Sequence, residues 1–460
     1  MFFERELYRE FIEWAQTQSD KPGYVLYLQG PRQVGKTELL LKLGREQFDT
    51  YVYVDMKRDK EKFEYLMAYH SEQFGGATHP EASGPIWEGV FRDFGQGYAN
   101  NGRTLVILDE IQESRSAYNA IRYMRRGLKS KLAVSGSYLG IVTQSHDFFI
   151  AVGDLHLMEL SSMTFVEFLK ACGAWSEYSL IKTFDLAEMR ETEKEACERV
   201  RELYKVYCEI GGYPDVVEAW VNGRGMKTCR RISSDILKLL YNESSRYFGE
   251  IVGSTLWRHT LERVAAHMVT KSGDLDIAVA KEYFRGEESN GLEIRRKDKI
   301  NALKWLEDCR IVGMVRLYDE LGRVTSTSNK SQFYFRDMGM ITQLCKNSVT
   351  LLPSDITGMT AENFVYLQLK EAAGKQFLED DVWSYSSNRE QIDFIIHNNE
   401  RTRFGIEVKH GSGGTKSGDR ALADGRIDYL IRVQDTYGRI EGNQATVPIF
   451  MLDKLPMVTS

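Results

Sequence analysis

The chain has 460 residues, of which 42% are hydrophobic and 27% charged, and its formal net charge at pH 7 is -6. This length exceeds what one hydrophobic core usually organises, so we expect two or three domains. The net negative charge argues against a protein whose whole surface binds nucleic acid. It is compatible with a basic surface confined to one part of the protein. The six cysteines are scattered without a C-x-x-C pair, which predicts reduced thiols and neither disulfides nor zinc ligands.

The N-terminal sequence and the hydropathy pattern predict neither a membrane span nor a signal peptide. No run reaches the roughly 18 apolar residues of a membrane span. The charged start, MFFERELYRE, lacks the apolar core of a signal peptide. We therefore expect a cytoplasmic protein.

The first predicted elements are a strand, a glycine-rich loop and a helix. Residues 24–29 (YVLYLQ) favour a strand, and ELLLKLG after the loop predicts a helix that stops at Gly44. The loop has the pattern G-x-x-x-x-G-K-[ST], formed by Gly30, Pro31, Arg32, Gln33, Val34, Gly35, Lys36 and Thr37. Backbone N–H groups of such a loop surround phosphates, the lysine reaches the β and γ phosphates, and the threonine hydroxyl binds Mg²⁺. The pattern predicts an ATP site with Mg²⁺ as cofactor.

Two further strands support this site. Residues 51–55 (YVYVD) and the continuously apolar residues 104–108 (TLVIL) are typical of buried parallel strands. The second run ends in Asp109 and Glu110, at the sheet edge where open α/β sheets bind ligands. We expect Asp109 to hold Mg²⁺ and Glu110 to orient and polarise the attacking water.

The next predicted strand ends in small polar residues. A basic helix over residues 118–131 precedes the run Leu132 to Val134, which closes on Ser135-Gly136-Ser137. The hydroxyl of Ser135 would lie at the same sheet edge, where AAA-type ATPases keep a group that senses the γ-phosphate. A simple Ser-Gly turn is the alternative.

The strings GPRQVGKT, LDEIQ and SGS resemble the AAA-type ATPase domain of a widespread prokaryotic family. Its members join this domain to a C-terminal restriction-endonuclease-like domain of uncharacterised function. Four further strings extend the resemblance over nearly the whole chain: MTFVEFL (163–169), GGYPDVV (211–217), YFRDMGM (334–340) and ENFVYLQL (362–369).

One departure from AAA-type ATPases concerns arginine. Many of them place an arginine after the sensing strand, where a neighbouring subunit uses it on the transferred phosphoryl group. Residues 135–173 contain no arginine, and Gly153-Asp154 stands where the resembled family often has Gly-Arg. Either Arg122, Arg125 or Arg126 supplies it, or hydrolysis is slow and the nucleotide acts as a switch, which we favour.

The central third of the chain is predicted to be mainly helical. Residues 308–318 favour a helix end followed by a strand, and residues 332–335 a second strand. Helices followed by two strands are typical of a winged helix, which the resemblance also implies. A basic stretch around Arg295-Arg296-Lys297, with Lys299 and Lys304, could contact DNA phosphates. A solvated helix face is the alternative, because acidic residues are interleaved with the basic ones.

Beyond residue 351 the pattern returns to α/β. Glu362 stands on a predicted helix, Asp393 opens one strand, and Glu407 and Lys409 end another, on the same side because strand side chains repeat every two residues. Asp393, Glu407 and Lys409 can converge as in PD-(D/E)XK nucleases, where two carboxylates hold Mg²⁺ and the lysine activates water. Lys416 and Arg420, in and after a glycine-rich segment, could contact phosphates or belong to an ordinary surface loop.

These elements predict an α/β fold in three parts: a P-loop ATPase domain with a parallel sheet (1–175), a helical and winged-helix-like region (176–350), and a nuclease-like domain (351–460). Three functions stay open. The protein is a slow ATPase whose nucleotide state controls the C-terminal half, an ATP-regulated Mg²⁺-dependent DNA endonuclease of a defence type, or an ATPase with a non-catalytic module that binds DNA or a partner. Oligomers are compatible with all three.

Overall fold

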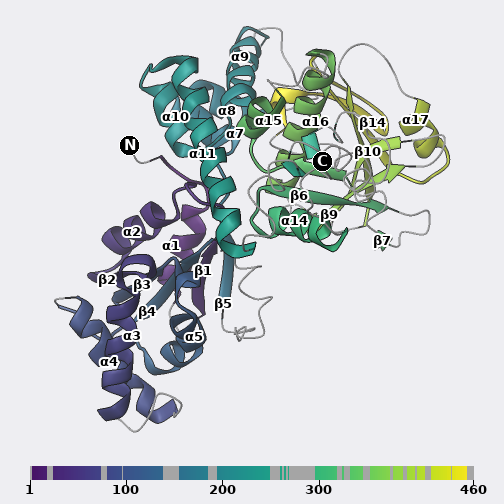
Figure 1. The fold of residues 1–460 in the computed structure, drawn as a ribbon. Helices are drawn as coiled ribbons and strands as arrows, with labels where there is room; N and C mark the ends of the chain where they lie inside the picture. Colours follow the sequence, from purple (N-terminus) through teal and green to yellow (C-terminus); the bar gives the residue numbers. More distant parts are fainter. Residues whose placement is uncertain are drawn as a thin grey trace, which may run out of the picture. The chain divides into compact units, whose positions relative to one another are not determined.

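The structure is a computed structural model that forms two compact units: residues 1–163 with 308–310, and residues 164–307 with 311–460 (Figure 1). The residues it describes are 3–17, 24–73, 80–95, 97–137, 155–184, 194–248, 260–261, 264–265, 268, 296–318, 324–325, 332–345, 353–372, 377–386, 391–398, 401–409, 416–436 and 438–452.

The first unit is built on a five-stranded parallel sheet. Its strands are β1 (Val25–Gln29), β2 (Thr50–Asp55), β3 (Thr104–Asp109), β4 (Lys131–Gly136) and β5 (Leu155–Glu159). They lie in the order β2-β3-β4-β1-β5, so β1 and β3 are separated by β4. All four pairings are parallel. Consequently β1, β3 and β4 all end at one edge of the sheet, where the predicted nucleotide residues lie.

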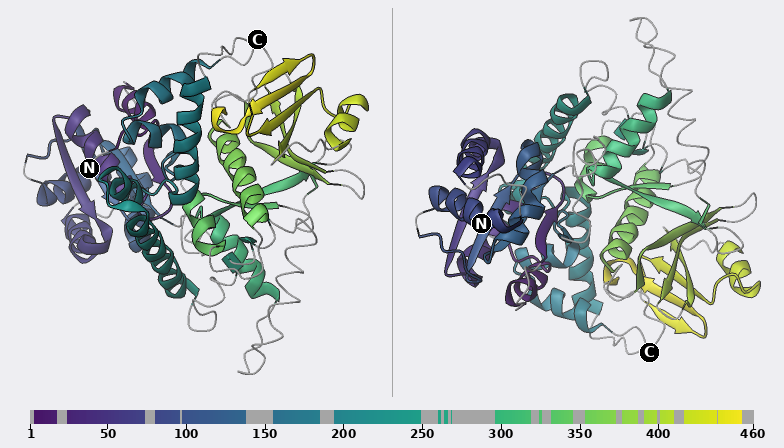
Figure 2. Two further views of the ribbon diagram at one scale, coloured as in Figure 1. Left: turned by 90° about the horizontal axis from the view of Figure 1, so that it is seen from above. Right: turned by 90° about the horizontal axis from the view of Figure 1, so that it is seen from below.

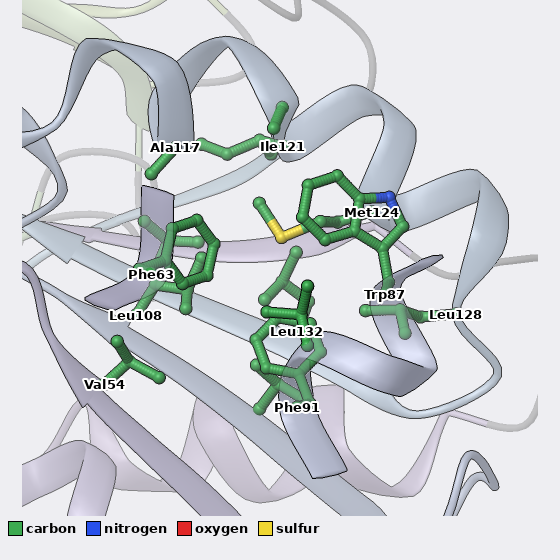
Figure 3. Packing of buried hydrophobic residues seen from close by; sticks show 14 of the residues in the cluster. Val54, Phe63, Trp87, Phe91, Leu108, Ala117, Ile121, Met124, Leu128 and Leu132 are labelled. Atoms are coloured by element: carbon green, nitrogen blue, oxygen red, sulfur yellow. The ribbon is translucent and has the colours of Figure 1, made fainter. Parts of the chain in front are cut away.

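Helices cover this sheet and bury its apolar faces. They are α1 (Tyr8–Gln16), α2 (Lys36–Gln47), α3 (Met56–Gln73), α4 (Pro80–Phe94) and α5 (Arg115–Gly127). One hydrophobic cluster joins α3, α4 and α5 to the sheet, with Phe63, Trp87 and Phe91 packed over Leu108 and Leu132 (Figure 3). All five side chains are buried. This cluster anchors β3 and β4, which carry Asp109 and Ser135.

The prediction that α2 stops at Gly44 is wrong, because the helix continues to Gln47. Gly44 serves packing instead. A Cβ at this position would lie 2.8 Å from the ring of Tyr51 on β2. Glycine is therefore required where α2 crosses the neighbouring strand, and a close approach of this kind leaves the same sequence signal as a helix terminator.

The second unit begins with a helical region, as predicted. The helices that the structure describes in the second unit are α7 (Phe165–Ala171), α8 (Trp175–Thr183), α9 (Lys194–Ile210), α10 (Pro214–Val221), α11 (Gly225–Phe248), α14 (Arg296–Asp308), α15 (Met338–Cys345), α16 (Pro353–Ala372) and α17 (Lys416–Ala423). The helix at 165–171 starts with a complete capping box, in which Thr164 and Glu167 exchange hydrogen bonds. An aromatic cluster of Phe165, Tyr204 and Phe364 joins α7, α9 and α16.

A nine-stranded mixed sheet completes the second unit (Figure 2). Its strands are β6 (Val312–Tyr318), β7 (Val324–Thr325), β8 (Gln332–Phe335), β9 (Phe377–Ser386), β10 (Gln391–Asn398), β11 (Arg403–Lys409), β12 (Tyr429–Gln434), β13 (Arg439–Glu441) and β14 (Gln444–Pro448). Seven of the strands form the path β14-β12-β11-β10-β9-β6-β7, with β13 beside β14 and β8 beside β6. The predicted strands at 312–318 and 332–335 pair antiparallel with each other.

These two units give the α/β class expected from the sequence: a parallel P-loop-type sheet, a helical region and a C-terminal mixed sheet. The pairing of β6 with β9 carries the sheet across residue 350. The three-part domain division stays a prediction. The six cysteines are thiols. Among the helices that the structure describes, none combines the length and apolar character needed to cross a bilayer.

Candidate functional site

The glycine-rich loop links β1 to α2 in a conformation that depends on glycine. Gly30 has φ +152°, and a Cβ there would lie 2.0 Å from the carbonyl oxygen of Leu160, just after β5. Gly35, the N-cap of α2, has φ +95°. Both positions lie in the region that L side chains rarely adopt. The loop therefore reverses direction tightly and presents the N-terminus of α2, which favours anions.

Arg5 fixes the outer side of this loop. Its guanidinium donates to the carbonyl oxygens of Val34 at 2.9 Å and Ser161 at 2.7 Å. The Leu160 backbone N–H donates to Gln29 at 2.9 Å. The loop is thus held between β1 and the segment after β5. Arg5 could not be predicted from the sequence, because its partners lie 29 and 156 residues away.

The Lys36 ammonium lies over the loop. The residue is only 6% exposed, and its Nζ donates to the carbonyl oxygens of Gly30 at 2.9 Å and Pro31 at 2.7 Å and to Ser137 Oγ at 2.8 Å. All three acceptors are oxygens, as phosphate oxygens are. The geometry places the positive charge at the edge where β1 and β4 end.

A second cluster is centred on Asp109, which is buried. Its Oδ2 accepts hydrogen bonds from Thr37 Oγ1 at 2.6 Å and from Tyr53 OH at 2.9 Å, and its Oδ1 accepts one from Ser135 Oγ. Burial, followed by the neighbouring Asp109 carboxylate, raises the pKa of Tyr53 well above its ordinary value. The phenol therefore stays protonated at neutral pH and keeps donating.

The oxygens of Thr37 and Asp109 fit Mg²⁺. In the part of the chain that the structure describes, no group of three or more His, Cys, Asp and Glu side chains is arranged to hold a metal. Mg²⁺ does not need one, because it keeps several waters and usually takes one or two protein oxygens together with phosphate oxygens. A hydroxyl and a carboxylate side by side supply the protein share of such a shell.

Glu110 lies at the same edge, one residue beyond the Mg²⁺-type pair. Its backbone adopts a left-handed conformation with φ +53°, which turns its carboxylate toward the glycine loop. The carboxylate accepts a hydrogen bond from the amide of Gln112 and lies 4.0 Å from Nη2 of Arg32. The structure therefore brings the predicted water-activating residue and the loop together.

The structure separates one arginine of α5 from this site. The Arg125 guanidinium lies 5.4 Å from the ring centroid of Tyr24. Tyr24 immediately precedes β1, so this contact is at the edge of the sheet opposite the glycine loop. Arg122 and Arg126 are exposed on the same helix. The pair Gly153-Asp154 lies outside the described residues.

The three predicted nuclease residues meet on neighbouring strands. The antiparallel register of β10 and β11 places Asp393 across from Glu407; they are 6% and 1% exposed. Asp393 Oδ2 accepts from the backbone N–H of Val408 at 2.8 Å. The Lys409 ammonium lies 3.7 Å from Glu407 Oε2. Two carboxylates and a lysine thus share one place in the sheet, as the alternation of side chains predicted.

Helix α17 supports Glu407. The backbone N–H of Gly418 donates to Glu407 Oε1 at 2.9 Å, and a Cβ at Gly418 would lie 2.9 Å from the same oxygen. The helix can approach this closely only with glycine there. Lys416 and Arg420 are exposed on α17, and residues 410–415 lie outside the described residues.

Glu362 on α16 accepts a hydrogen bond whose donor the sequence did not predict. Tyr334 OH on β8 donates to Glu362 Oε1 at 2.7 Å, and the two residues are buried. Burial and then the Glu362 carboxylate raise the pKa of Tyr334 well above its ordinary value. The predicted basic stretch is described only in part: the Arg295 position and the side chains of residues 296–299 lie outside the described residues, and Lys304 is exposed.

Comparisons with known proteins bear on two segments. Residues 23–169 match a family model described as an AAA domain, so the glycine loop, Asp109, Glu110 and Ser135 lie in an AAA-type P-loop ATPase domain. Residues 201–351 match a model described as a domain of unknown function (DUF8612). No curated protein matches the chain.

Several solved structures are similar at low identity. The DNA-bound ORC1 protein of Aeropyrum pernix is 14% identical over 75% of this chain and 93% of its own, with a TM-score of 0.31. AMPPCP-bound DnaA of Aquifex aeolicus is 14% identical over 67% and 90%, with a TM-score of 0.23. A signal-transduction ATPase of Pyrococcus horikoshii is 11% identical over 81% and 46%, with a TM-score of 0.29. At these TM-scores the likenesses carry no argument about function.

Proposed function

We propose that the N-terminal unit binds ATP with Mg²⁺ and hydrolyses it slowly, and that its nucleotide state controls the C-terminal half. The observation that carries this proposal is the meeting of Lys36, Thr37 and Asp109 at the carboxyl ends of β1 and β3. Lys36 neutralises phosphate charge, and Thr37 and Asp109 hold the metal ion. A cytoplasmic location belongs to the same proposal.

Glu110 and the serines after β4 would complete the reaction site. Glu110 orients the attacking water and receives its proton. Ser135 holds Asp109 in place, and Ser137, which contacts the Lys36 ammonium, is well placed to sense the γ-phosphate. The sequence pointed to Ser135 for the sensing role, and the geometry favours Ser137, two residues later on the same side of the chain. We expect turnover below about one per second, under the ordinary enzyme median.

Replacing Lys36 by alanine should weaken binding of Mg²⁺-ATP on the order of 10- to 100-fold, because charge-assisted hydrogen bonds to phosphate contribute about 1.5–3 kcal/mol. Fluorescent-nucleotide titration measures this. Lys42→Ala on the same helix is the matched control, since Lys42 belongs to an i,i+4 surface pair with Glu46 and should bind ATP normally. Unchanged ATP affinity in Lys36→Ala would overturn the central assignment.

An ATP-regulated DNA endonuclease is the second candidate function. Asp393, Glu407 and Lys409 support it, because two adjacent buried carboxylates can share Mg²⁺ and a nearby ammonium can position water for attack on a phosphodiester. The hydrogen bonds from Val408 and Gly418 fix the carboxylates in orientation. These contacts equally suit a nuclease-like fold retained for DNA or partner binding, so the two outcomes need an experiment.

A nicking assay separates these outcomes. If the endonuclease proposal is right, the full chain will nick supercoiled plasmid in Mg²⁺ and ATP, and Asp393→Ala or Lys409→Ala will reduce nicking at least 100-fold, in the range of general acid–base contributions. Asp424→Ala is the control, because Asp424 is in an exposed pair with Arg426. DNA binding without cleavage in Mg²⁺ or Mn²⁺, with ATP or ADP, would favour the non-catalytic module.

A further inference from the structure

Arg32 occupies the third position of the glycine loop and lies beside two carboxylates. Its Nη2 is 3.6 Å from Glu113 Oε1 and 4.0 Å from Glu110 Oε2. The side chain is 17% exposed, so the loop carries this guanidinium inside the site and away from bulk solvent. Charge interactions there are screened less than at an open surface.

The distance from Arg32 to Glu110 indicates how far this guanidinium would lie from the γ-phosphate of a bound triphosphate. A water that Glu110 activates would lie about 3 Å from the carboxylate and about 3–3.5 Å from the γ-phosphorus. A positive group 4.0 Å from the same carboxylate is therefore close to the γ-phosphate that this water would attack. Lys36 is a separate positive group, held by the loop carbonyl oxygens of Gly30 and Pro31.

We propose that Arg32 is the chain's own arginine for the γ-phosphate, and that it replaces the arginine that AAA-type ATPases commonly receive from a neighbouring subunit. This inference rests on the proposed ATPase function. Water adds to the γ-phosphorus, the bond to the β,γ-bridging oxygen breaks with its electron pair leaving on ADP, and the water's proton passes to Glu110. Arg32 takes no proton and neutralises the charge that develops on the γ-phosphoryl oxygens.

This assignment explains one observation from the sequence and is consistent with the turnover proposed above. The stretch from residue 135 to residue 173 can lack arginine because the charge is supplied within the loop. It also agrees with slow turnover, since GTPases that carry their arginine within the same chain hydrolyse at about 10⁻² per second. Without nucleotide, the carboxylates of Glu110 and Glu113 hold the Arg32 guanidinium near the site. When ATP binds, the γ-phosphate oxygens carry more negative charge than either carboxylate and attract the guanidinium more strongly.

Comparing ADP with a non-hydrolysable ATP analogue tests the proposal. Both are titrated with Mg²⁺ into the wild-type chain, Arg32→Ala, Arg32→Lys and Arg103→Ala. Arg32→Ala should weaken the analogue on the order of 10- to 100-fold and change ADP affinity less than about twofold, because a γ-phosphate contact is absent in ADP. Arg32→Lys should be intermediate. Arg103→Ala, which removes an exposed pair with Asp49, should match the wild type.

Equal losses for ADP and the analogue, or no change in their ratio, would mean that Arg32 only holds Glu113 and Glu110, and would overturn the proposal. ADP binding by Arg32→Ala also shows that the variant is folded. A fall in turnover of roughly 20-fold or more should accompany the binding change. A wild-type chain that binds neither nucleotide would instead refute the ATPase function itself, so the two failures are distinguishable.

Discussion

Glu110→Gln should bind Mg²⁺-ATP with nearly wild-type affinity and hydrolyse it about 10²- to 10⁴-fold more slowly, the range that a positioned general base contributes. The glutamine amide has almost the same shape as the carboxylate, so the left-handed turn at residue 110 is kept. It cannot accept the proton of the attacking water. Single-turnover hydrolysis measured at saturating ATP isolates this step from product release.

The matched control is Glu88→Gln on α4. Glu88 belongs to an exposed i,i+4 pair with Arg92, and such pairs contribute about 0.3–0.5 kcal/mol. Its turnover should equal that of the wild type. If Glu110→Gln retained more than about a third of the wild-type rate, Glu110 would not be the base, and hydrolysis would have to proceed by positioning alone.

The grouping of residues in the candidate nucleotide site could be predicted from sequence because its signals are local. A strand, a glycine loop and a helix follow one another within residues 24–47, and the apolar run before Asp109 is readable by itself. Parallel strands end at the same sheet edge, which brings Asp109 to Thr37 without further information. The C-terminal pair Glu407 and Lys409 was accessible for the same reason, through alternation along one strand.

Contacts across long sequence separations could not be predicted. Leu160 packs against Gly30, and Arg5 reaches Val34 and Ser161, but nothing near either residue announces its partner. Gly44 shows the converse error, because packing against Tyr51 and helix termination both favour glycine. The strand order, which places β4 between β1 and β3, likewise depends on the whole chain.

The family-like strings outside the ATPase site meet one another in the second unit. The backbone N–H of Phe335 donates to Asn363 Oδ1 at 2.7 Å, and Asn363 Nδ2 donates to the Phe335 carbonyl at 3.1 Å. These paired bonds join YFRDMGM to ENFVYLQL much as a neighbouring strand would. Asp337 in turn joins YFRDMGM to GGYPDVV through Gly212. These strings therefore form one hydrogen-bonded packing contact, the joint of the second unit. Sequence similarity alone cannot distinguish such a contact from a catalytic site.

Replacing Asp337 by alanine should lower the free energy of unfolding of the second unit by about 3–5 kcal/mol. Asp337 is 3% exposed, and its carboxylate accepts from the N–H groups of Gly212 at 2.8 Å and Gly339 at 2.9 Å. Removing it leaves two buried donors without their acceptor, and each such group costs about 1–3 kcal/mol. Urea unfolding followed by circular dichroism measures the change.

Two further variants serve as an intermediate case and a control for Asp337→Ala. Asp337→Asn keeps one carbonyl acceptor and should lose roughly half as much stability, since only one of the two N–H groups loses its partner. Asp215→Ala removes an exposed carboxylate from the first turn of α10 and should change stability by less than about 1 kcal/mol. The backbone around Asp337 is closely packed and has little room to rearrange after the substitution. Gly211 has φ +75°, and a Cβ there would lie 2.3 Å from Asp337 Oδ1. A loss below about 1 kcal/mol in Asp337→Ala would therefore mean that solvent enters the joint and satisfies both donors.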